Sequence, residues 1–190
     1  MKKSILKPVV VLAVAIASSA FVDTVSKEVK VEESEVTWKG YKVTGSHYGT
    51  VALQSGTLEF KGDVLTGGDF TVDMTTIGST DLSGEYKDQL DGHLKSDDFF
   101  GVEKYPTATL KITKVTSTGK NSYAAVGDLT IKEKTKPIEF EISVYGIKAT
   151  ANLKIDRSKY DIRYGSGSFF DNLGDKTIYD EFDLEVDLAF

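Results

Sequence analysis

Apolar and polar residues alternate along most of this chain with a period of two, and no other feature restricts its fold as strongly. The segment 182–188 has Phe, Leu, Val and Leu at its even positions and Asp, Glu and Asp at its odd positions. The segment 138–144 follows the same rule. Successive side chains of a strand point to opposite faces. These segments therefore predict antiparallel strands with one buried and one solvated face.

About eight such segments follow one another, separated by short turns. They cover residues 36–43, 51–60, 70–75, 108–113, 125–131, 138–144, 147–155 and 182–189. Helices do not alternate with the strands, so a parallel sheet is not expected. We see no linker and no repeat of fixed period. The pattern indicates one all-β domain, built as a sandwich or as a closed barrel.

Two features favour the barrel. The strands are long and contain internal glycines, Gly56, Gly67 and Gly68, at which a strand can bend as closure requires. Small residues also share the inward face with large ones, and these are Ala125, Gly127, Ala149 and Ala151. A barrel of about eight strands is just wide enough to hold one small ligand. In the alternative, facing aromatic side chains fill that space, and the candidates are Phe70, Phe140 and Phe182.

One helix is expected, from about Glu85 to Lys95. Leu90 and Leu94 lie four residues apart, on one helical face. Two aromatic residues, Phe99 and Phe100, follow the helix, and Pro106 makes the chain leave in an extended conformation. A single helix ending in two aromatics within an all-β chain predicts a plug or lid near one end of the barrel.

Residues 1–20 have the pattern of a cleaved secretory signal. Lys2, Lys3 and Lys7 precede the apolar run 9–17, and small residues 18–20 follow it. The run is too short to span a bilayer, so we do not expect a stable membrane anchor, although a retained anchor is the alternative. The domain is then residues 21–190, exported to a periplasm or secreted.

Net charge and cysteine content exclude some classes of partner and of covalent support. Loss of the three signal lysines moves the net charge from −6 to −9. Such an acidic protein is not expected to bind nucleic acid by charge. The chain has no cysteine, so no disulfide can stabilise the fold and no lipidated cysteine can anchor it. The sequence does not fix the oligomeric state, and a dimer is compatible with it.

Four motifs, in order, resemble the YceI-like family of exported, lipocalin-like proteins. They lie at residues 69–80, at 93–100 with 105–106, at 127–132 with 135–137, and at 156–162. The chain departs from the family pattern at Glu133, Lys134 and Asp161, where glycines are usual, and His47 is only a candidate for the early histidine. The resemblance implies an eight-stranded antiparallel barrel with a helix near one end. It also implies a long apolar cavity for an isoprenoid chain.

Inward strand residues are the candidate walls of a lipid site, because burial of hydrocarbon gives about 0.8 kcal/mol per CH₂ group. We select Trp38, Tyr41, Phe70, Val72, Met74, Leu110, Ile112, Phe140 and Ile142. The alternative for each is an ordinary core residue.

The remaining candidates lie in predicted turns and loops or at the end of the helix. Phe99 and Phe100 are either a gate over the lipid or a closing anchor. His47 and His93 can bond a head group or have only local partners. Arg157 can pair with a phosphate, or with Asp156 or Asp161 to order the long loop 157–175. Phe169 and Phe170 lie in that loop.

We expect no catalytic residue, metal or cofactor. The chain has two histidines, far apart in sequence, and no recognisable nucleophile arrangement. The acidic residues at 171–175 do not have the spacing of a calcium-binding loop.

The leading hypothesis is non-enzymatic binding, carriage or sequestration of a polyisoprenoid or similar long-chain apolar lipid. One alternative is a filled barrel that presents the loop 165–175 to a protein partner. The other is a lipid-modifying enzyme.

Overall fold

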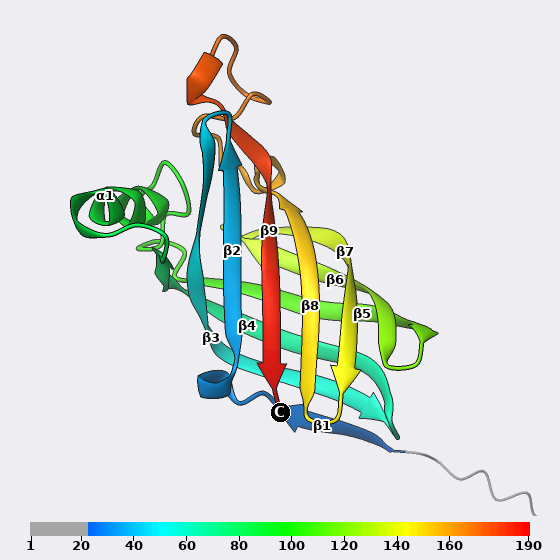
Figure 1. Ribbon diagram of the computed structural model, residues 1–190. Coiled ribbons are helices and arrows are strands. Elements are labelled where there is room, and N and C mark those ends of the chain that lie inside the picture. The colour runs from blue at the N-terminus through cyan, green and yellow to red at the C-terminus, as the bar shows by residue number, and fades with distance from the viewer. Residues whose placement is uncertain (1–22) are drawn as a thin grey trace, which may run out of the picture.

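Eight strands, β2 to β9, form a closed ring in which each strand is antiparallel to both neighbours. The structure is a computed structural model that describes residues 23–190 (Figure 1). The order around the ring is β3-β2-β9-β8-β7-β6-β5-β4, and the pairing of β4 with β3 closes it. The predicted eight-stranded antiparallel barrel with one short helix is confirmed.

The strands are β1 (Thr24–Glu28), β2 (Glu35–Lys42), β3 (Gly45–Lys61), β4 (Val64–Ser79), β5 (Thr107–Gly119), β6 (Ser122–Ile131), β7 (Lys134–Tyr145), β8 (Lys148–Asp156) and β9 (Ile178–Ala189). The α-helix is α1 (Gly84–Lys95), and short 3-10 helices are η1 (Val31–Glu33), η2 (Arg157–Tyr160) and η3 (Gly174–Lys176).

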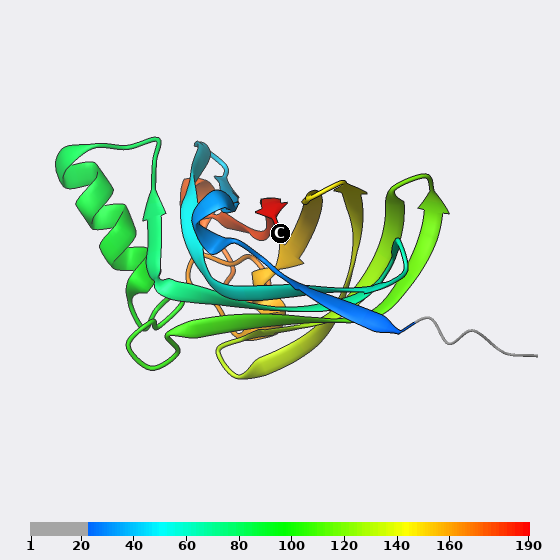
Figure 2. The ribbon, with the colours of Figure 1, turned by 90° about the horizontal axis from the view of Figure 1, so that it is seen from below.

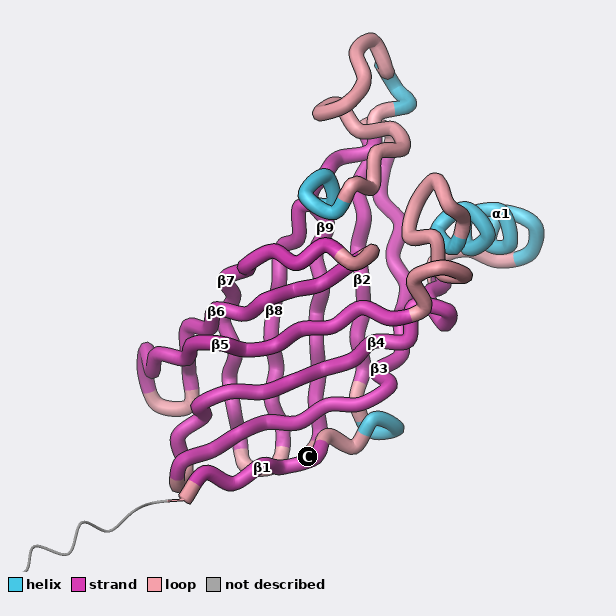
Figure 3. Tube along the Cα trace, turned by 180° about the vertical axis from the view of Figure 1, so that it is seen from behind, coloured by secondary structure: helices cyan, strands magenta, loops and turns pink. Residues whose placement is uncertain are grey.

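The length of β3 allows the ring to close. Its first part pairs with β2, as in Thr37 with Thr50, and its last part pairs with β4, as in Lys61 with Val64. The register between β3 and β4 shifts at three places, which bends both strands. As a result, β3 to β6 cross β2, β8 and β9 at a steep angle (Figure 3).

The ninth strand, β1, has no counterpart in the sequence-based prediction. Its five residues are all exposed, so it lacks the buried face that produces an alternating pattern. It pairs only with the end of β3. Residues 45–50, which lie between the predicted strand segments 36–43 and 51–60, belong to β3, and the hairpin turn is formed by Val43 and Thr44.

Helix α1 has the predicted position in the chain, and its apolar face points to the barrel. Leu94 is buried and Leu90 is partly buried against the core. The helix lies outside the ring of strands, beside β4, and does not plug it (Figure 2). Asp91 accepts a hydrogen bond from the Ser79 amide at 2.7 Å, and Lys87 bonds both Asp91 and the Ser79 carbonyl. These bonds hold α1 to the end of β4.

We call the end of the barrel near α1 the upper end and the end near β1 the lower end, as in Figure 1. Two aromatic rings close the lower end. The centroids of Phe60 and Phe190 are 5.7 Å apart, and both side chains are buried. The Nζ of Lys27, from β1, lies 4.7 Å from the Phe60 ring and 5.0 Å from the Phe190 ring. The unpredicted strand thus supplies a cation over this aromatic pair.

The signal sequence expected at residues 1–20 lies outside the described residues. Within residues 23–190, the structure has no helix with the length and apolar character needed to cross a membrane.

Candidate functional site

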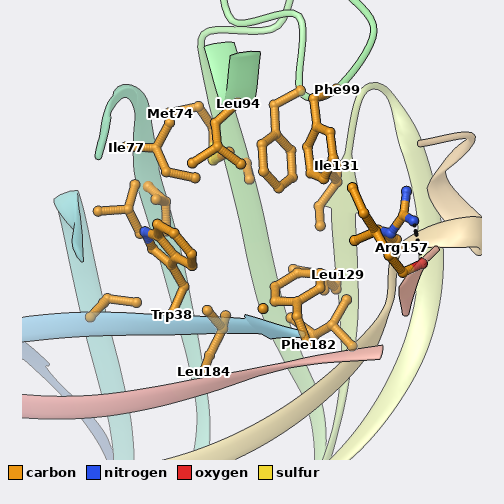
Figure 4. A pocket seen from close by; sticks show the side chains of 18 of the residues that line it. Trp38, Met74, Ile77, Leu94, Phe99, Leu129, Ile131, Arg157, Phe182 and Leu184 are labelled. Carbon is orange, nitrogen blue, oxygen red and sulfur yellow. Dashed lines mark hydrogen bonds between the residues drawn. The ribbon is translucent and has the colours of Figure 1, made fainter. Parts of the chain in front are cut away.

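The upper half of the barrel encloses an apolar cavity of about 120 Å³, here called the upper cavity. Figure 4 shows Trp38, Phe182 and Leu184 on one side of it, and Phe99, Met74 and Leu94 on another. Its walls are Val36, Trp38, Gly40, Tyr41, Val51, Val72, Met74, Ile77, Leu94, Phe99, Phe100, Ala108, Leu129, Ile131, Ile155, Arg157, Ile178, Tyr179, Phe182 and Leu184. The strands supply most of these side chains because their inward positions are apolar.

The loop of residues 96–106, here called the cover loop, closes the upper cavity from above. The rings of Phe99 and Phe100 lie edge to face, with centroids 5.2 Å apart, and both are buried. Backbone bonds hold the loop to itself and to α1, including Gly101 N to Ser96 O at 2.8 Å. The lid predicted for the helix is therefore formed by the loop that follows it.

Lys132 ties the β6–β7 hairpin to the cover loop. Its Nζ donates a hydrogen bond to the carbonyl oxygen of Phe99 at 2.9 Å. Burial lowers the pKa of Lys132 from its usual value, an effect that nearby Asp161 opposes. Lys132 and Glu133 both have positive φ angles, 49° and 59°, which side chains adopt at a cost. The side-chain bond to Phe99 gives a physical reason for a lysine at this left-handed position.

The guanidinium of Arg157 is buried at the upper end and bonds backbone carbonyls of the long loop and of the start of β9. It donates to the carbonyls of Tyr179 at 3.1 Å, Ile162 at 2.8 Å and Ile178 at 2.9 Å. The Nη2 atom of Arg157 also lies 3.5 Å from Asp180 Oδ1. Burial lowers the pKa of Arg157 below its usual value, and Asp180 counteracts part of that effect.

The alternative ion pairs of Arg157 with Asp156 or Asp161 do not form, although Arg157 does bond the long loop through the Ile162 carbonyl. A pair with a phosphate remains a prediction. Asp156 instead caps η2 by accepting a bond from the Ser158 amide, and Asp161 pairs with Arg163. The guanidinium also lies 5.4 Å from the Phe99 ring, so the long loop and the cover loop meet there.

A second apolar cavity of about 80 Å³, the lower cavity, lies in the middle of the barrel. It is lined by Val36, Leu53, Phe70, Val72, Ala108, Thr109, Leu110, Ile112, Leu129, Phe140, Ile142, Ala151, Leu153, Leu184, Val186 and Leu188. The two cavities share five of these residues, which we call the waist: Val36, Val72, Ala108, Leu129 and Leu184. The expected single long cavity is thus two smaller ones that meet at the waist.

Glycines in the barrel wall give room to large side chains, which reduces the space that small residues were expected to leave. A Cβ atom on Gly56 would lie 2.8 Å from the Phe70 ring. A Cβ atom on Gly127 would lie 2.8 Å from Leu110 and 3.5 Å from Phe140. Aromatic side chains therefore fill part of the lower barrel, as the alternative prediction held.

Tyr41 lines the upper cavity but directs its hydroxyl to a charged pair. The hydroxyl donates to Asp183 Oδ2 at 2.6 Å, and Lys154 donates to Asp183 Oδ1 at 2.9 Å. These two bonds, that of Tyr41 first, hold the pKa of Asp183 below its usual value. The same bond to Asp183 raises the pKa of Tyr41.

The structure brings most of the sequence-predicted residues to the two cavities. Those on the upper cavity are Trp38, Tyr41, Val72, Met74, Phe99, Phe100 and Arg157, and those on the lower cavity are Phe70, Val72, Leu110, Ile112, Phe140 and Ile142. Four candidates line neither cavity: His47, His93, Phe169 and Phe170. Contact of any of these residues with a ligand remains a prediction.

The two histidines have different local partners. His47 Nδ1 lies 2.9 Å from Asp81 Oδ2, which joins β3 to the segment before α1. The His93 ring packs against Tyr164 and Phe99, with centroids 4.3 Å and 5.6 Å apart. Within residues 23–190, the structure contains no cluster of three or more side chains suited to hold a metal ion.

Several wall residues were not selected from the sequence. Those of the upper cavity are Val36, Gly40, Val51, Ile77, Leu94, Ala108, Leu129, Ile131, Ile155, Ile178, Tyr179, Phe182 and Leu184. Many lie at predicted inward positions, so alternation could have found them. Alternation does not show how far along the barrel axis a residue lies. It therefore could not distinguish residues that line a cavity from residues of the packed core.

Comparisons with known proteins place this fold in a family. A UPF0312 protein of Vibrio parahaemolyticus is 35% identical over 88 residues, which are 42% of this chain and 46% of that protein. The matched stretch thus spans about half the length of that relative. A UPF0312 protein of Vibrio campbellii is 29% identical over 151 residues, covering 77% of this chain and 76% of the relative.

Solved structures show the same fold. BcnA of Burkholderia cenocepacia aligns with a TM-score of 0.66 at 20% identity, over 85% of this chain and 99% of that one. A polyisoprenoid binding domain from Saccharophagus degradans aligns with a TM-score of 0.58 at 11% identity, over 85% and 95%. The model of the YceI-like domain matches residues 24–190, the whole of the barrel. The chain therefore belongs to the YceI-like domain family.

Proposed function

We propose that this protein binds, carries or sequesters an isoprenoid lipid, a polyisoprenoid or a similar long-chain apolar molecule, in the barrel interior without changing it chemically. The supporting observation is the upper cavity, which is enclosed by apolar side chains and covered by a loop. An apolar pocket of this kind favours hydrocarbon, because burial removes apolar surface from water. The solved relative described as a polyisoprenoid binding domain supports the same class of ligand.

The proposal includes export. The pattern of residues 1–20 is that of a cleaved signal, and the acidic composition suits a protein that stays soluble outside the cytoplasm. N-terminal sequencing of the protein from its periplasmic or secreted fraction tests this part. A mature chain that still begins at Met1 would contradict it.

Native mass spectrometry tests the binding. Protein purified from its own host without lipid stripping should carry an adduct with the mass of an isoprenoid lipid, and a stripped sample should recover the adduct when prenyl lipids are added. Repeated absence of both adducts would reject the proposal. A variant with the exposed change Tyr86→Phe serves as the control, because this side chain is 75% exposed and lines neither cavity.

A second candidate function rests on exposed aromatic side chains in and beside the long loop. Phe169 and Phe170 are 39% and 50% exposed, and Tyr164 and Tyr179 are also exposed. Tyrosine and phenylalanine are enriched in protein interfaces. An interaction module would use this surface and would not need the cavities.

A further inference from the structure

Strand β7 contributes nothing to the wall of the upper cavity. The cavity is lined by residues of β6 and of β8, the two neighbours of β7, but by no residue of β7 itself. The first four residues of β7, 134–137, are exposed on both faces of the strand, whereas Phe140 and Ile142 are buried. Pro137, which has no N–H to donate, lies in this exposed part. The first part of β7 therefore lies away from the core at the level of the upper cavity.

Strands β7 and β8 also separate at this level. Their pairing ends at Glu141 and Asn152. In contrast, β7 stays paired with β6 as far as Lys134, and β8 stays paired with β9 as far as Asp156. Hydrogen bonds between adjacent strands are what close a barrel wall. The wall thus has a gap between the first part of β7 and the last part of β8.

Tyr160 fills this gap. It belongs to η2, the short helix that follows β8, and it is 1% exposed and part of the hydrophobic core. Helix η2 contacts β7 and lies beside it (Figure 3). On the outer surface, the gap is marked by a pocket, here called the side pocket, which is lined by Lys136, Pro137, Ile138, Glu139, Lys154, Asp156, Lys159, Tyr160 and Glu181. Tyr160 therefore closes the wall where the two strands do not pair.

This closure is bonded on one side only. Arg157 joins η2 to the carbonyls of Ile178 and Tyr179, at the start of β9. In the described part of the chain, no hydrogen bond or ion pair joins residues 157–162 to β7. The hydroxyl of Tyr160 is buried there without a hydrogen-bond partner, and burial raises the pKa of Tyr160 to about 12. Such a hydroxyl is unfavourable, so its exposure to water offsets part of the cost of opening.

We infer that a lipid enters and leaves the upper cavity from the side of the barrel, through the gap between β7 and β8, when Tyr160 moves away from β7. This inference rests on the proposed function. Opening at this place breaks no hydrogen bond between strands. The other two approaches are held more firmly, since backbone bonds fix the cover loop and the packed rings of Phe60 and Phe190 close the lower end. Rates through two routes add, so a variant that loosens the cover loop can also speed exchange.

A reversible crosslink across the side pocket tests the route. The chain has no cysteine, so an introduced pair can be joined selectively. Lys136→Cys with Lys159→Cys, joined by a short bis-methanethiosulfonate reagent, ties η2 to β7. Trp38 is the only tryptophan of the chain and lines the upper cavity, so its stopped-flow fluorescence follows the binding and release of farnesol. The crosslink should cause an almost complete loss of both rates, and dithiothreitol should restore them.

The matched control is a crosslink between strands that already pair. Thr130 of β6 and Thr135 of β7 are paired, and their hydroxyls lie 2.8 Å apart. Thr130→Cys with Thr135→Cys, joined by the same reagent, should therefore leave both rates as they are in the native protein.

Tyr160→Phe tests the gate without a crosslink, because it removes the unpartnered hydroxyl and keeps the ring. The closed form is then favoured, so both rates should fall by about fivefold. The dissociation constant should stay the same, since binding and release use the same opening. Tyr123→Phe is the control, because Tyr123 is also buried but lines neither the two cavities nor the side pocket. A tyrosine with only a structural role would change stability without slowing both rates equally.

The outcomes separate the two proposals. If farnesol binds but neither the side-pocket crosslink nor Tyr160→Phe slows its exchange, the inference about the route is wrong and lipid binding stands. If no prenyl alcohol or prenyl lipid binds to the native protein, the proposed function itself is wrong.

Discussion

The Nζ of Lys132 donates a hydrogen bond to the carbonyl oxygen of Phe99 at 2.9 Å, so the β6–β7 hairpin holds the loop that covers the upper cavity. The two residues are far apart in sequence, and they meet because the hairpin and the cover loop lie at the same end of the barrel (Figure 1). The bond adds a side-chain tie from the barrel to the backbone bonds that hold the cover loop to α1.

Removal of this bond should loosen the cover. Lys132→Met keeps an unbranched side chain and the strained left-handed backbone but removes the donor, so we expect the free energy of unfolding to fall by about 1 kcal/mol. Exchange of a bound prenyl alcohol should become faster. Urea unfolding and stopped-flow fluorescence of Trp38 measure the two effects. Lys132→Gly is the matched variant, because it also lacks the donor but relieves the positive φ angle, and it should be more stable than Lys132→Met. Equal exchange rates in all three proteins would show that the bond does not control access.

Arg157→Lys should destabilise the protein by about 3 kcal/mol, although the positive charge is retained. A lysine cannot reach the carbonyls of Ile162, Ile178 and Tyr179 at once, and it leaves buried acceptors without donors. Thermal or urea unfolding gives the loss. Arg163→Lys is the control, since Arg163 is largely exposed and its replacement should change stability by less than about 0.5 kcal/mol. Similar stability of the two variants would contradict the bridging role of Arg157.

The bond from Tyr41 to Asp183 should make stability depend on acid pH. It holds the pKa of Asp183 below the usual value of 3.8, so the folded protein binds that proton less readily than the unfolded chain. The resulting stabilisation is complete above the unfolded pKa and is lost as pH falls through the folded one. Tyr41→Phe should therefore be less stable than the native protein at neutral pH, with a difference that shrinks below about pH 3.8.

Urea unfolding over an acid series measures that difference. Tyr48→Phe is the control, because Tyr48 is 47% exposed and its hydroxyl has no side-chain partner in residues 23–190. A difference between Tyr41→Phe and the native protein that does not change with pH would assign the effect to packing.

Phe99→Ala should open the upper cavity and lower the free energy of unfolding by about 3 kcal/mol, because it removes a buried ring that contacts Phe100 and the Arg157 guanidinium. Phe169→Ala makes the same chemical change at a residue that is 39% exposed and should cost less than about 1 kcal/mol. Chemical denaturation compares the two. Equal losses would mean that Phe99 contributes no more than a surface aromatic.

The variant with both Phe169→Ser and Phe170→Ser separates the two candidate functions. If the protein is a lipid carrier, the variant should bind prenyl alcohols as the native protein does, because neither residue lines a cavity. If the exposed loop recognises a protein, the variant should lose a partner that the native protein retains in a pull-down. If the variant folds but no longer binds prenyl alcohols, the loop takes part in lipid binding although neither residue lines a cavity.

Alternation of apolar and polar residues by itself determined the strands and their inward faces, because a strand with one apolar face must bury that face. It left a sandwich and a barrel open, and the internal glycines, the small inward residues and the family resemblance favoured the barrel. Local chemistry placed the one α-helix, through Leu90 and Leu94, and the extended chain that follows it at Pro106. The exposed strand β1 could not be predicted because it has no buried face. The partners of Arg157 could not be predicted because Ile178 and Tyr179 lie near it only in the closed barrel. Only the tertiary structure decided that the interior holds two cavities that meet at the waist. Leu129 and Leu184 are ordinary inward residues in the sequence. That both line the upper and the lower cavity depends on the tilt and register of strands from opposite walls, which no local pattern records.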